Sequence, residues 1–215
     1  WTQVGGDVVS ESKQGFGYAV ALSEDGRRLA VGMGSAHKAC VYEQIDQNFW
    51  SMIGGDFLVT SQSSATYDWA GTAVALSRNG SRVAVAAHNG PVSVFTLGPS
   101  STTWNILGNA IPIQAHRRIS LSDDGQTVAA GVESNDVYGV PGYALVFKFD
   151  TVIGDWIQKG EIRGIEDGER FGRSISLSGD GKVLAIGGNY ALNFAGVSRV
   201  FIWDELGSNW QQVGS

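Results

Sequence analysis

FGYAVALSEDGRRLAVG, residues 16–32, decides the fold of this chain because it recurs three more times. The other copies are AGTAVALSRNGSRVAVA (70–86), HRRISLSDDGQTVAAG (116–131) and FGRSISLSGDGKVLAIGG (171–188), and all four align on Ser23, Ser77, Ser122 and Ser178. In each copy an Asp-Gly or Asn-Gly pair separates two apolar runs. Such a pair is a strong signal for a β-hairpin, because glycine accepts the positive φ of a tight turn. Each copy therefore predicts two antiparallel strands.

A third strand and a tryptophan follow every hairpin. The third strands are KACVYE, PVSVFTL, YALVFKF and SRVFIWD, and neighbouring residues at their centres are apolar on both faces. A strand of this kind is covered on both faces. We take as equivalent the pairs separated by ten residues: Cys40 with Trp50, Val94 with Trp104, Val146 with Trp156, and Val200 with Trp210. Cys40 then matches three valines and is predicted to be a core residue.

Four strands per unit and a period of about 52 residues predict an all-β fold, a β-propeller of four four-stranded blades. A closed barrel is the structural alternative. We expect residues 1–215 to form a single repeat domain. Its predicted parts are an extra N-terminal Trp strand at 1–6 and blades at 7–55, 56–109, 110–161 and 162–215.

The extra strand WTQVGG repeats WQQVGS at the other end of the chain. If the ring closes within the chain, the two segments compete for one edge; otherwise the extra strand pairs with a neighbouring molecule, or the chain was cut from a longer array. An unpaired edge strand is a template for strand addition. We therefore predict self-association through an assembly strand formed by Trp1, Gln3, Val4, Trp210, Gln212 and Val213.

Composition excludes several classes of partner. The 215 residues are 43% hydrophobic, enough for a core that needs no metal or disulfide. The formal net charge is −6, and lysine and arginine are scattered, so we expect no binding to nucleic acid, which requires clustered cations. Because no apolar run approaches the ~20 residues of a membrane helix, we also expect no membrane insertion.

The units FGYAVALSEDGRRLAVG and FGRSISLSGDGKVLAIGG resemble FG-GAP-type propeller repeats, such as those of integrin α-chains, and the hairpin repeats of TolB-like propellers. The Phe-Gly pair stands at Phe16-Gly17 and Phe171-Gly172, whereas the second copy has Ala70-Gly71 and the third has Ala115-His116. The resemblance implies a propeller fold. The calcium loop of the FG-GAP family is absent, because SEDGRRL and SGDGKVL offer too few oxygen ligands. We therefore predict no calcium site.

The sequence predicts no catalytic residue, no cofactor and no metal site. The histidines, His37, His88 and His116, fall at different offsets within their repeats and do not show metal-ligand spacing. The recurrent serines are explained by the hairpin turn, in which a serine side chain bonds its local backbone.

Two groups of loop residues are candidates for ligand or interface contacts. The segment 161–169 carries carboxylates that could hold a cation or serve glycoside hydrolysis, namely Glu166, Asp167 and Glu169. Nearby arginines favour a solvated charge cluster instead. The exposed aromatic candidates, which would suit a glycan, are Trp69, Tyr138 and Tyr190.

Asn79-Gly80-Ser81 is a sequon for N-glycosylation at a hairpin tip. Together with the resemblance, it favours an extracellular or cell-surface protein. We expect a non-catalytic structural or adhesive propeller whose partner is a protein, most simply a copy of itself. The alternatives are a glycan-binding lectin-like propeller and a propeller glycoside hydrolase.

Overall fold

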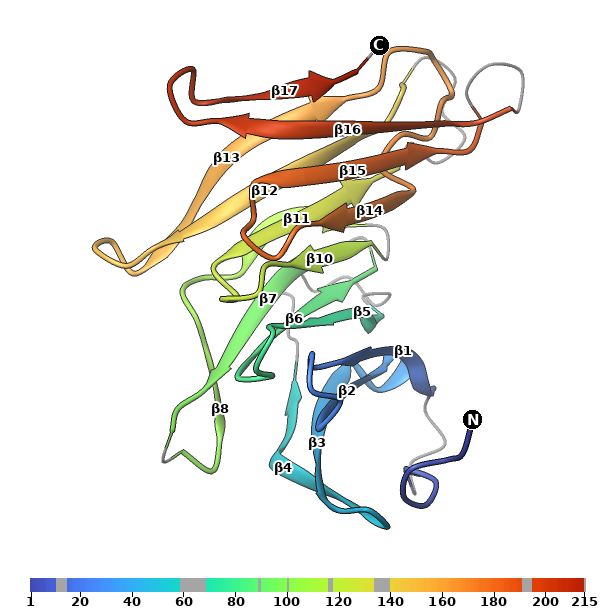
Figure 1. Ribbon diagram of the computed structural model, residues 1–215, viewed down its shortest axis with the longest axis vertical. Helices are drawn as coiled ribbons and strands as arrows, with labels where there is room; N and C mark the ends of the chain where they lie inside the picture. The colour runs from blue at the N-terminus through green and yellow to red at the C-terminus, as the bar shows by residue number, and fades with distance from the viewer. Residues whose placement is uncertain are drawn as a thin grey trace.

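The computed structural model describes residues 1–10, 15–58, 69–88, 90–99, 101–115, 118–133, 140–190 and 195–214. Within these residues the chain forms β-strands and one short 3-10 helix, η1 (Gly34–Ala36), but no α-helix. The strands build four antiparallel sheets that follow one another along the length of the molecule (Figure 1). This confirms the predicted all-β fold with four propeller-type blades.

Each sheet runs in chain order from its first strand to its last. The first sheet contains β1 (Phe16–Leu22), β2 (Arg28–Met33), β3 (Lys38–Asp46) and β4 (Phe49–Leu58). The second contains β5 (Ala70–Leu76), β6 (Arg82–Ala87), β7 (Gly90–Leu97) and β8 (Trp104–Ile106), with β9 (Ile111–Ala115) also paired to β7. The third contains β10 (Ile119–Leu121), β11 (Thr127–Val132), β12 (Tyr143–Asp150) and β13 (Asp155–Arg163). The fourth contains β14 (Ser174–Leu177), β15 (Val183–Gly188), β16 (Val197–Asp204) and β17 (Asn209–Val213).

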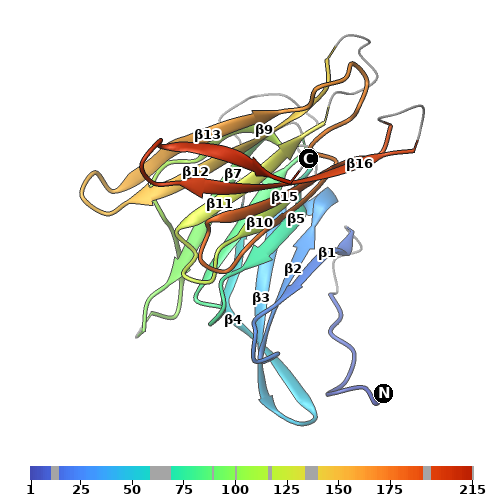
Figure 2. The ribbon, with the colours of Figure 1, turned by 45° about the horizontal axis from the view of Figure 1, so that its top comes forward.

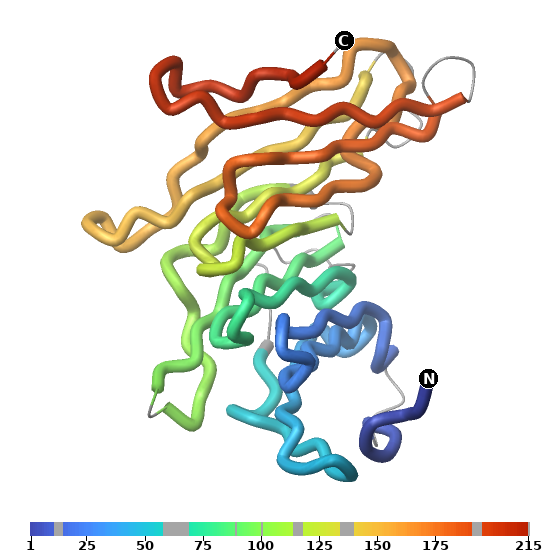
Figure 3. Tube along the Cα trace, viewed as in Figure 1, coloured from blue at the N-terminus to red at the C-terminus, as the bar shows by residue number. Residues whose placement is uncertain are grey.

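The first strands of consecutive sheets contact one another, so β1, β5, β10 and β14 form the inner edge of the stack. Figures 2 and 3 show the same succession from another angle and as a trace of the chain. The first and fourth sheets lie at opposite ends of the molecule, and so do the two termini (Figure 1). The four described blades thus form an open row, in which each inner sheet is covered on both faces.

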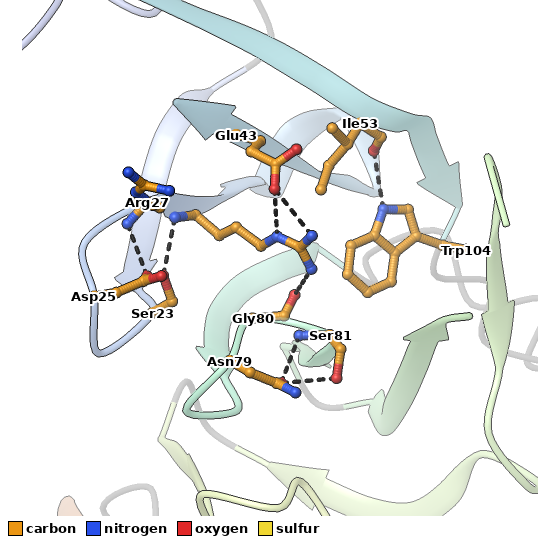
Figure 4. Close-up of polar contacts among 10 residues, drawn as sticks. Ser23, Asp25, Arg27, Glu43, Ile53, Asn79, Gly80, Ser81 and Trp104 are labelled. Atoms are coloured by element: carbon orange, nitrogen blue, oxygen red, sulfur yellow. Dashed lines mark hydrogen bonds and ion pairs between the residues drawn. The ribbon is translucent and has the colours of Figure 1, made fainter. Parts of the chain in front are cut away.

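The hairpin turns use the chemistry that the repeated Ser-x-Asp-Gly pattern predicts. In the third sheet, the Ser122 hydroxyl donates to Asp124 Oδ1 over 2.6 Å and accepts from the Thr127 N–H at 2.9 Å. The other turns repeat this arrangement, and Figure 4 shows it for Ser23 and Asp25. The recurrent serines are therefore structural, as predicted.

Neighbouring sheets pack large side chains against small ones. At the third interface, Ala129 and Ala144 of the third sheet meet Leu184, Ile186 and Phe171 of the fourth. Small residues allow two twisted sheets to approach closely, and larger ones fill the remaining space. The core is consequently a series of layers between sheets.

The register of the first sheet corrects one predicted equivalence. Ala30 pairs with Val41, as Ala84 pairs with Val94 in the second sheet, so Val41 rather than Cys40 occupies the valine position. The reason is that only nine residues separate Val41 from Trp50, one fewer than in the other sheets. Cys40 is nonetheless fully buried, and its burial raises the pKa of the thiol to about 11.

The N-terminal segment does not join a regular β-ladder, although it resembles an outer strand in sequence. The N–H groups of Gly5 and Gly6 donate to the carbonyls of Gln47 and Asn48 at 2.8 and 3.3 Å. Trp50 Nε1 donates to the carbonyl of Val4 at 3.1 Å. Val4 thus supplies to Trp50 the backbone acceptor that Ile53 supplies to Trp104, and Leu107 to Trp156, from the preceding sheet.

Candidate functional site

Two arginines stand where the inner strands of the third and fourth sheets begin. Arg118 directly precedes β10, and Arg173 directly precedes β14. Arg118 Nε donates to the carbonyl of Arg173 at 2.6 Å, which ties the two sheets together. Arg173 Nη1 donates to Glu133 Oε2 at 2.7 Å, and Glu133 follows β11. The Arg173 guanidinium is therefore held in place by a carboxylate from the neighbouring sheet.

Both guanidinium groups line a cavity of about 530 Å³. The rest of its described lining is small or polar, and among these residues there is no carboxylate: Ser174, Gly187, Gly188, Asn189, Ala195, Gly196, Val197 and Ser198. Two guanidinium groups in the wall of a hollow whose described lining holds no carboxylate favour an anionic occupant, although Arg173 also pairs with Glu133 outside that lining. Arginine suits carboxylate or phosphate, because its planar donors match two oxygens at once.

The floor of this cavity is a cross-strand row of two hydroxyls around a glycine. Ser174 of β14 pairs with Gly187 of β15, which in turn pairs with Ser198 of β16. A Cβ on Gly187 would lie 2.3 Å from Ser174 Oγ and 3.6 Å from Ser198 Oγ. The glycine therefore lets both hydroxyls stand beside the backbone in the cavity.

A wider hollow of about 890 Å³ lies at the other end of the stack, between the first and second sheets. Here the carboxylate that pairs with an arginine is part of the lining: Arg28 pairs with Glu43 at 3.0 Å, and Arg82 Nη1 donates to the carbonyl of Asp124 at 2.9 Å. Because Glu43 itself lines this hollow, its charge is balanced. The cavity beside Arg118 and Arg173 is the better candidate for an anion.

The predicted acidic cluster is divided by the structure. Glu169 is fully buried; its Oε2 accepts from the N–H groups of Ile165 and Glu166 at 2.9 and 3.1 Å, and its other oxygen pairs with Arg199. Glu166 and Asp167 are exposed. The expectation of a solvated charge cluster is therefore wrong for Glu169, whose carboxylate closes a turn and neutralises a buried cation.

The aromatic candidates come from separate parts of the stack. Trp69 precedes β5 in the second sheet, whereas Tyr190 follows β15 in the fourth, where Arg170 lies over its ring at 4.0 Å from the centroid. Tyr138 lies outside the described residues. The structure does not bring Trp69 and Tyr190 onto one sheet, so the glycan platform stays a prediction.

Asn79 lies at an exposed hairpin tip in the second sheet (Figure 4). Its Oδ1 accepts from the Ser81 N–H at 3.0 Å and from the Ser77 hydroxyl at 3.1 Å. The asparagine thus takes the part that aspartate takes in the other turns. Its glycosylation stays a prediction.

The residues of the predicted assembly strand lie at both ends of the stack. Trp1, Gln3 and Val4 are exposed, while Trp210, Gln212 and Val213 belong to β17 and pair with β16. The indole nitrogen of Trp210 is buried, and no group in the described part of the chain accepts from it. Association through these residues stays a prediction.

No group of three or more potential metal-ligating side chains occurs among the described residues. His37 follows η1, His88 follows β6, and His116 lies outside the described residues. No described helix is long and apolar enough to span a membrane.

The fold and the cavity define this chain as a propeller-type protein with a cationic hollow at its inner strands. No protein-family model and no curated protein matches the sequence. Solved structures do match. A protein from Bacteroides uniformis with the provisional name 6-phosphogluconolactonase has a TM-score of 0.64 and 15% identity, over 91% of this chain and 52% of that one.

A protein of the same provisional name from Bacteroides fragilis has a TM-score of 0.60 and 16% identity, over 99% of this chain and 57% of that one. The hydrazine synthase of Kuenenia stuttgartiensis has a TM-score of 0.57 and 16% identity, over 96% of this chain and 51% of that one. The chain thus spans about half the length of these structures. At such identity the likeness establishes the fold alone, and a fold hosts many functions.

These matches correct the functional prediction. The sequence predicted a non-catalytic structural or adhesive protein and no enzyme, whereas all three of these matching structures carry the name of an enzyme. The prediction failed because the repeats report only the architecture. Activity in such folds depends on loop residues, which follow no repeat.

Sequence reasoning also missed Arg118, Glu133 and Arg173. They occupy different offsets from the recurrent serines, so no spacing marks them as a group. The available signal was the position of two arginines at the starts of the third and fourth inner strands, near the axis on which a propeller's blades converge.

Proposed function

We propose that this chain forms the substrate-binding part of a propeller hydrolase that opens a small, anionic sugar lactone. The observation that carries the proposal is the cavity of about 530 Å³ with Arg118 and Arg173 in its wall and no carboxylate among its described lining residues. The provisional name shared by two matching structures suggests the substrate class, a lactone that bears a phosphate.

The chemistry of the cavity suits such a substrate. In lactone hydrolysis, water adds to the ring carbonyl, negative charge develops on its oxygen, and the ring C–O bond then breaks to leave a carboxylate and a hydroxyl. A guanidinium can hold the phosphate or stabilise the developing oxyanion. Glu133 is a positioning residue, because it fixes the Arg173 guanidinium at 2.7 Å. The hydroxyls of Ser174 and Ser198 are suitable partners for sugar hydroxyls.

The test compares 6-phosphogluconolactone with gluconolactone, following the acid released by the purified protein above the spontaneous rate. We expect Arg173→Gln to lower kcat/KM for the phosphorylated lactone about tenfold or more, since it removes a charged hydrogen-bonding group. Arg163→Gln is the matched control. Arg163 pairs with Glu161 on β13, away from the cavity lining, and its replacement should leave the rate unchanged.

Two results would overturn the proposal. One is hydrolysis of neither lactone above the spontaneous rate, together with no binding of 6-phosphogluconate by calorimetry. The other is equal loss of activity in Arg173→Gln and Arg163→Gln. Equal rates for both lactones would exclude the anionic substrate class.

Within the propellers, we assign the repeats to the FG-GAP-like or TolB-like type. Support comes from Gly71 and Gly172, which stand at the glycine position of the Phe-Gly pair in the second and fourth copies. Each packs against the backbone of the preceding sheet. An extracellular location is a separate proposal. It is tested by the intact mass of the protein from its native source, since an unmodified Asn79 there would remove its main support.

A further inference from the structure

The backbone joins neighbouring sheets in the same way at every turn end. The residue after the recurrent serine donates to its counterpart in the next sheet: Glu24 to Arg78 at 3.0 Å, Arg78 to Asp123 at 2.9 Å, and Asp123 to Gly179 at 2.8 Å. Within the described residues, no earlier sheet donates to the Glu24 carbonyl, and the Gly179 N–H reaches no later sheet. The first sheet therefore presents the acceptor of this hydrogen bond, the Glu24 carbonyl, and the fourth sheet presents the donor, the Gly179 N–H.

A close contact between glycines repeats in the same manner. A Cβ on Gly32 would lie 2.1 Å from the carbonyl oxygen of Gly71 in the next sheet, and a Cβ on Gly131 would lie 2.0 Å from that of Gly172. No larger residue could stand at these positions without separating the sheets. The contact explains the glycine at or just before the start of β5 and β14.

Glycines equivalent to those of this contact also stand at the two ends of the row. Gly187 stands nine residues after its recurrent serine, as Gly32 and Gly131 do after theirs. No later sheet among the described residues covers Gly187, and the space that a glycine carbonyl fills at the other two positions is taken there by Ser174 Oγ, 2.3 Å from an added Cβ. Gly17 is equivalent to Gly172, has the same left-handed backbone with φ +81°, and would meet nothing within 4 Å of an added Cβ.

Apolar side chains that are buried between inner sheets are exposed at the two ends. Leu22 of β1 is 59% exposed, whereas its equivalent Leu177 is 8% exposed. Val200 of β16 is 38% exposed, whereas its equivalent Val146 is fully buried. Exposed apolar residues gathered on a face that resembles an interface indicate a missing partner surface.

The outer face of the first sheet is already arranged for such packing. Phe16 meets Tyr42 edge-on with centroids 6.2 Å apart, and Phe171 meets Phe201 edge-on at 6.3 Å on the corresponding face of the fourth sheet. In the fourth sheet, this arrangement faces the third. The first sheet thus has the shape that the third interface uses, but no sheet covers it among the described residues, and Val8 of the N-terminal segment packs on part of it.

We propose that the first sheet of a second copy of this chain packs on the outward face of the fourth sheet. We define that face by Ser176, Ala185, Gly187 and Val200. The contact would repeat the established one between the third and fourth sheets, with Gly17 against Gly187 and Leu22 beside the small residues. The second copy is the occupant because it carries the matching half of every repeated contact.

The contact is heterologous, since different surfaces of the two copies meet. Two such contacts, made head to tail, would close a ring from the four described blades of each copy. The outward face includes Gly187, which also lines the cationic cavity. The second copy would therefore bring Tyr18, next to its Gly17, to the open side of that cavity; only this last step rests on the proposed function.

We expect the N-terminal segment, residues 1–6, to weaken this association. The segments WTQVG (1–5) and WQQVG (210–214) share four of five residues, and Val4 already accepts from Trp50. In the dimer, the N-terminal segment of one copy and β17 of the other would compete for the edge of β16. We expect a chain that lacks residues 1–6 to dimerise more tightly than the full chain.

The test is the mass of the protein in solution, measured by sedimentation equilibrium over a range of concentrations without substrate. We expect a dimer for the full chain and monomers for Val200→Asp and Leu22→Asp, because each places a charge in both contacts of the ring. Val152→Asp is the control, since Val152 is 93% exposed in the β12–β13 turn. Circular dichroism checks that each variant folds.

Mixing the two interface variants sharpens the test. The intact outward face of Leu22→Asp can bind the intact first sheet of Val200→Asp, so the mixture should form dimers that neither variant forms alone. A full chain that stays monomeric at every concentration would overturn the proposal. So would a dimer that both variants leave intact, or a mixture that stays monomeric. Failure of lactone hydrolysis would leave all these masses unchanged.

Discussion

Trp104 Nε1 donates a hydrogen bond to the carbonyl oxygen of Ile53 across 2.9 Å, and this bond links the outer strands of the first two sheets (Figure 4). Trp156 and Leu107 form the same bond at 2.8 Å between the second and third sheets. The tryptophans of the second and third sheets therefore act on the preceding sheet. Their shared role is to hold consecutive blades together.

We expect Trp104→Phe to lower the free energy of unfolding by about 1 kcal/mol from the lost hydrogen bond, in addition to any loss of packing. Trp210→Phe is a matched control, because the described residues offer no acceptor to the Trp210 indole. Urea unfolding followed by circular dichroism would measure both. Equal destabilisation by the two variants would show that ring packing, rather than the hydrogen bond, joins the blades.

Ser122→Ala should destabilise the third sheet. The Ser122 side chain is buried and bridges Asp124 Oδ1 and the Thr127 N–H, so its removal leaves the Thr127 donor without that partner. The expected loss is about 1–3 kcal/mol. Thermal unfolding measures it. Asp124→Asn should be nearly neutral, because Asn79 performs the same role in the second sheet; a large loss there would mean that the charge matters.

Glu169→Gln should be far more harmful than Glu161→Gln. Glu169 is fully buried with Arg199, whose side chain is 12% exposed, so the substitution leaves a poorly solvated cation. Breaking a buried pair costs about 3–5 kcal/mol. Glu161 pairs with the exposed Arg163, and its loss should cost about 0.2–1 kcal/mol. Chemical denaturation compares the two, and similar losses would contradict a structural role for the buried pair.

The protein should lose stability in acid. The Ser23 hydroxyl and then the Arg27 N–H lower the pKa of Asp25 below 3.8, and Ser178 and Lys182 do the same for Asp180. Because the folded pKa lies below the unfolded one, this stabilisation is complete above the unfolded value and disappears as the pH falls through the folded value. Urea midpoints measured from pH 7 downward should fall below about pH 4.

The double variant Asp25→Asn and Asp180→Asn tests that assignment. An asparagine keeps the Oδ1 acceptor but has no charge to titrate, so the variant should lose less stability between pH 7 and pH 3 than the original protein. A pH profile that is unchanged by the two substitutions would assign the acid sensitivity to other carboxylates.

The sequence by itself determined the hairpins, the four sheets and the role of the recurrent serines, because these depend on turn chemistry and on alternation between neighbouring residues. It placed Cys40 in the core but misplaced its equivalents, since a hairpin one residue shorter changes the register without changing the apolar pattern.

Only the tertiary structure decided the site. Arg118, Glu133 and Arg173 come from different strand ends, and stacking of the third and fourth sheets is what brings them together. The structure also buries Glu169, which the nearby arginines had suggested for a solvated cluster, against Arg199 of β16 and Gly188 of β15. Local sequence specifies short-range hydrogen bonds and strand periodicity, whereas the burial and proximity of loop side chains depend on how sheets pack on one another.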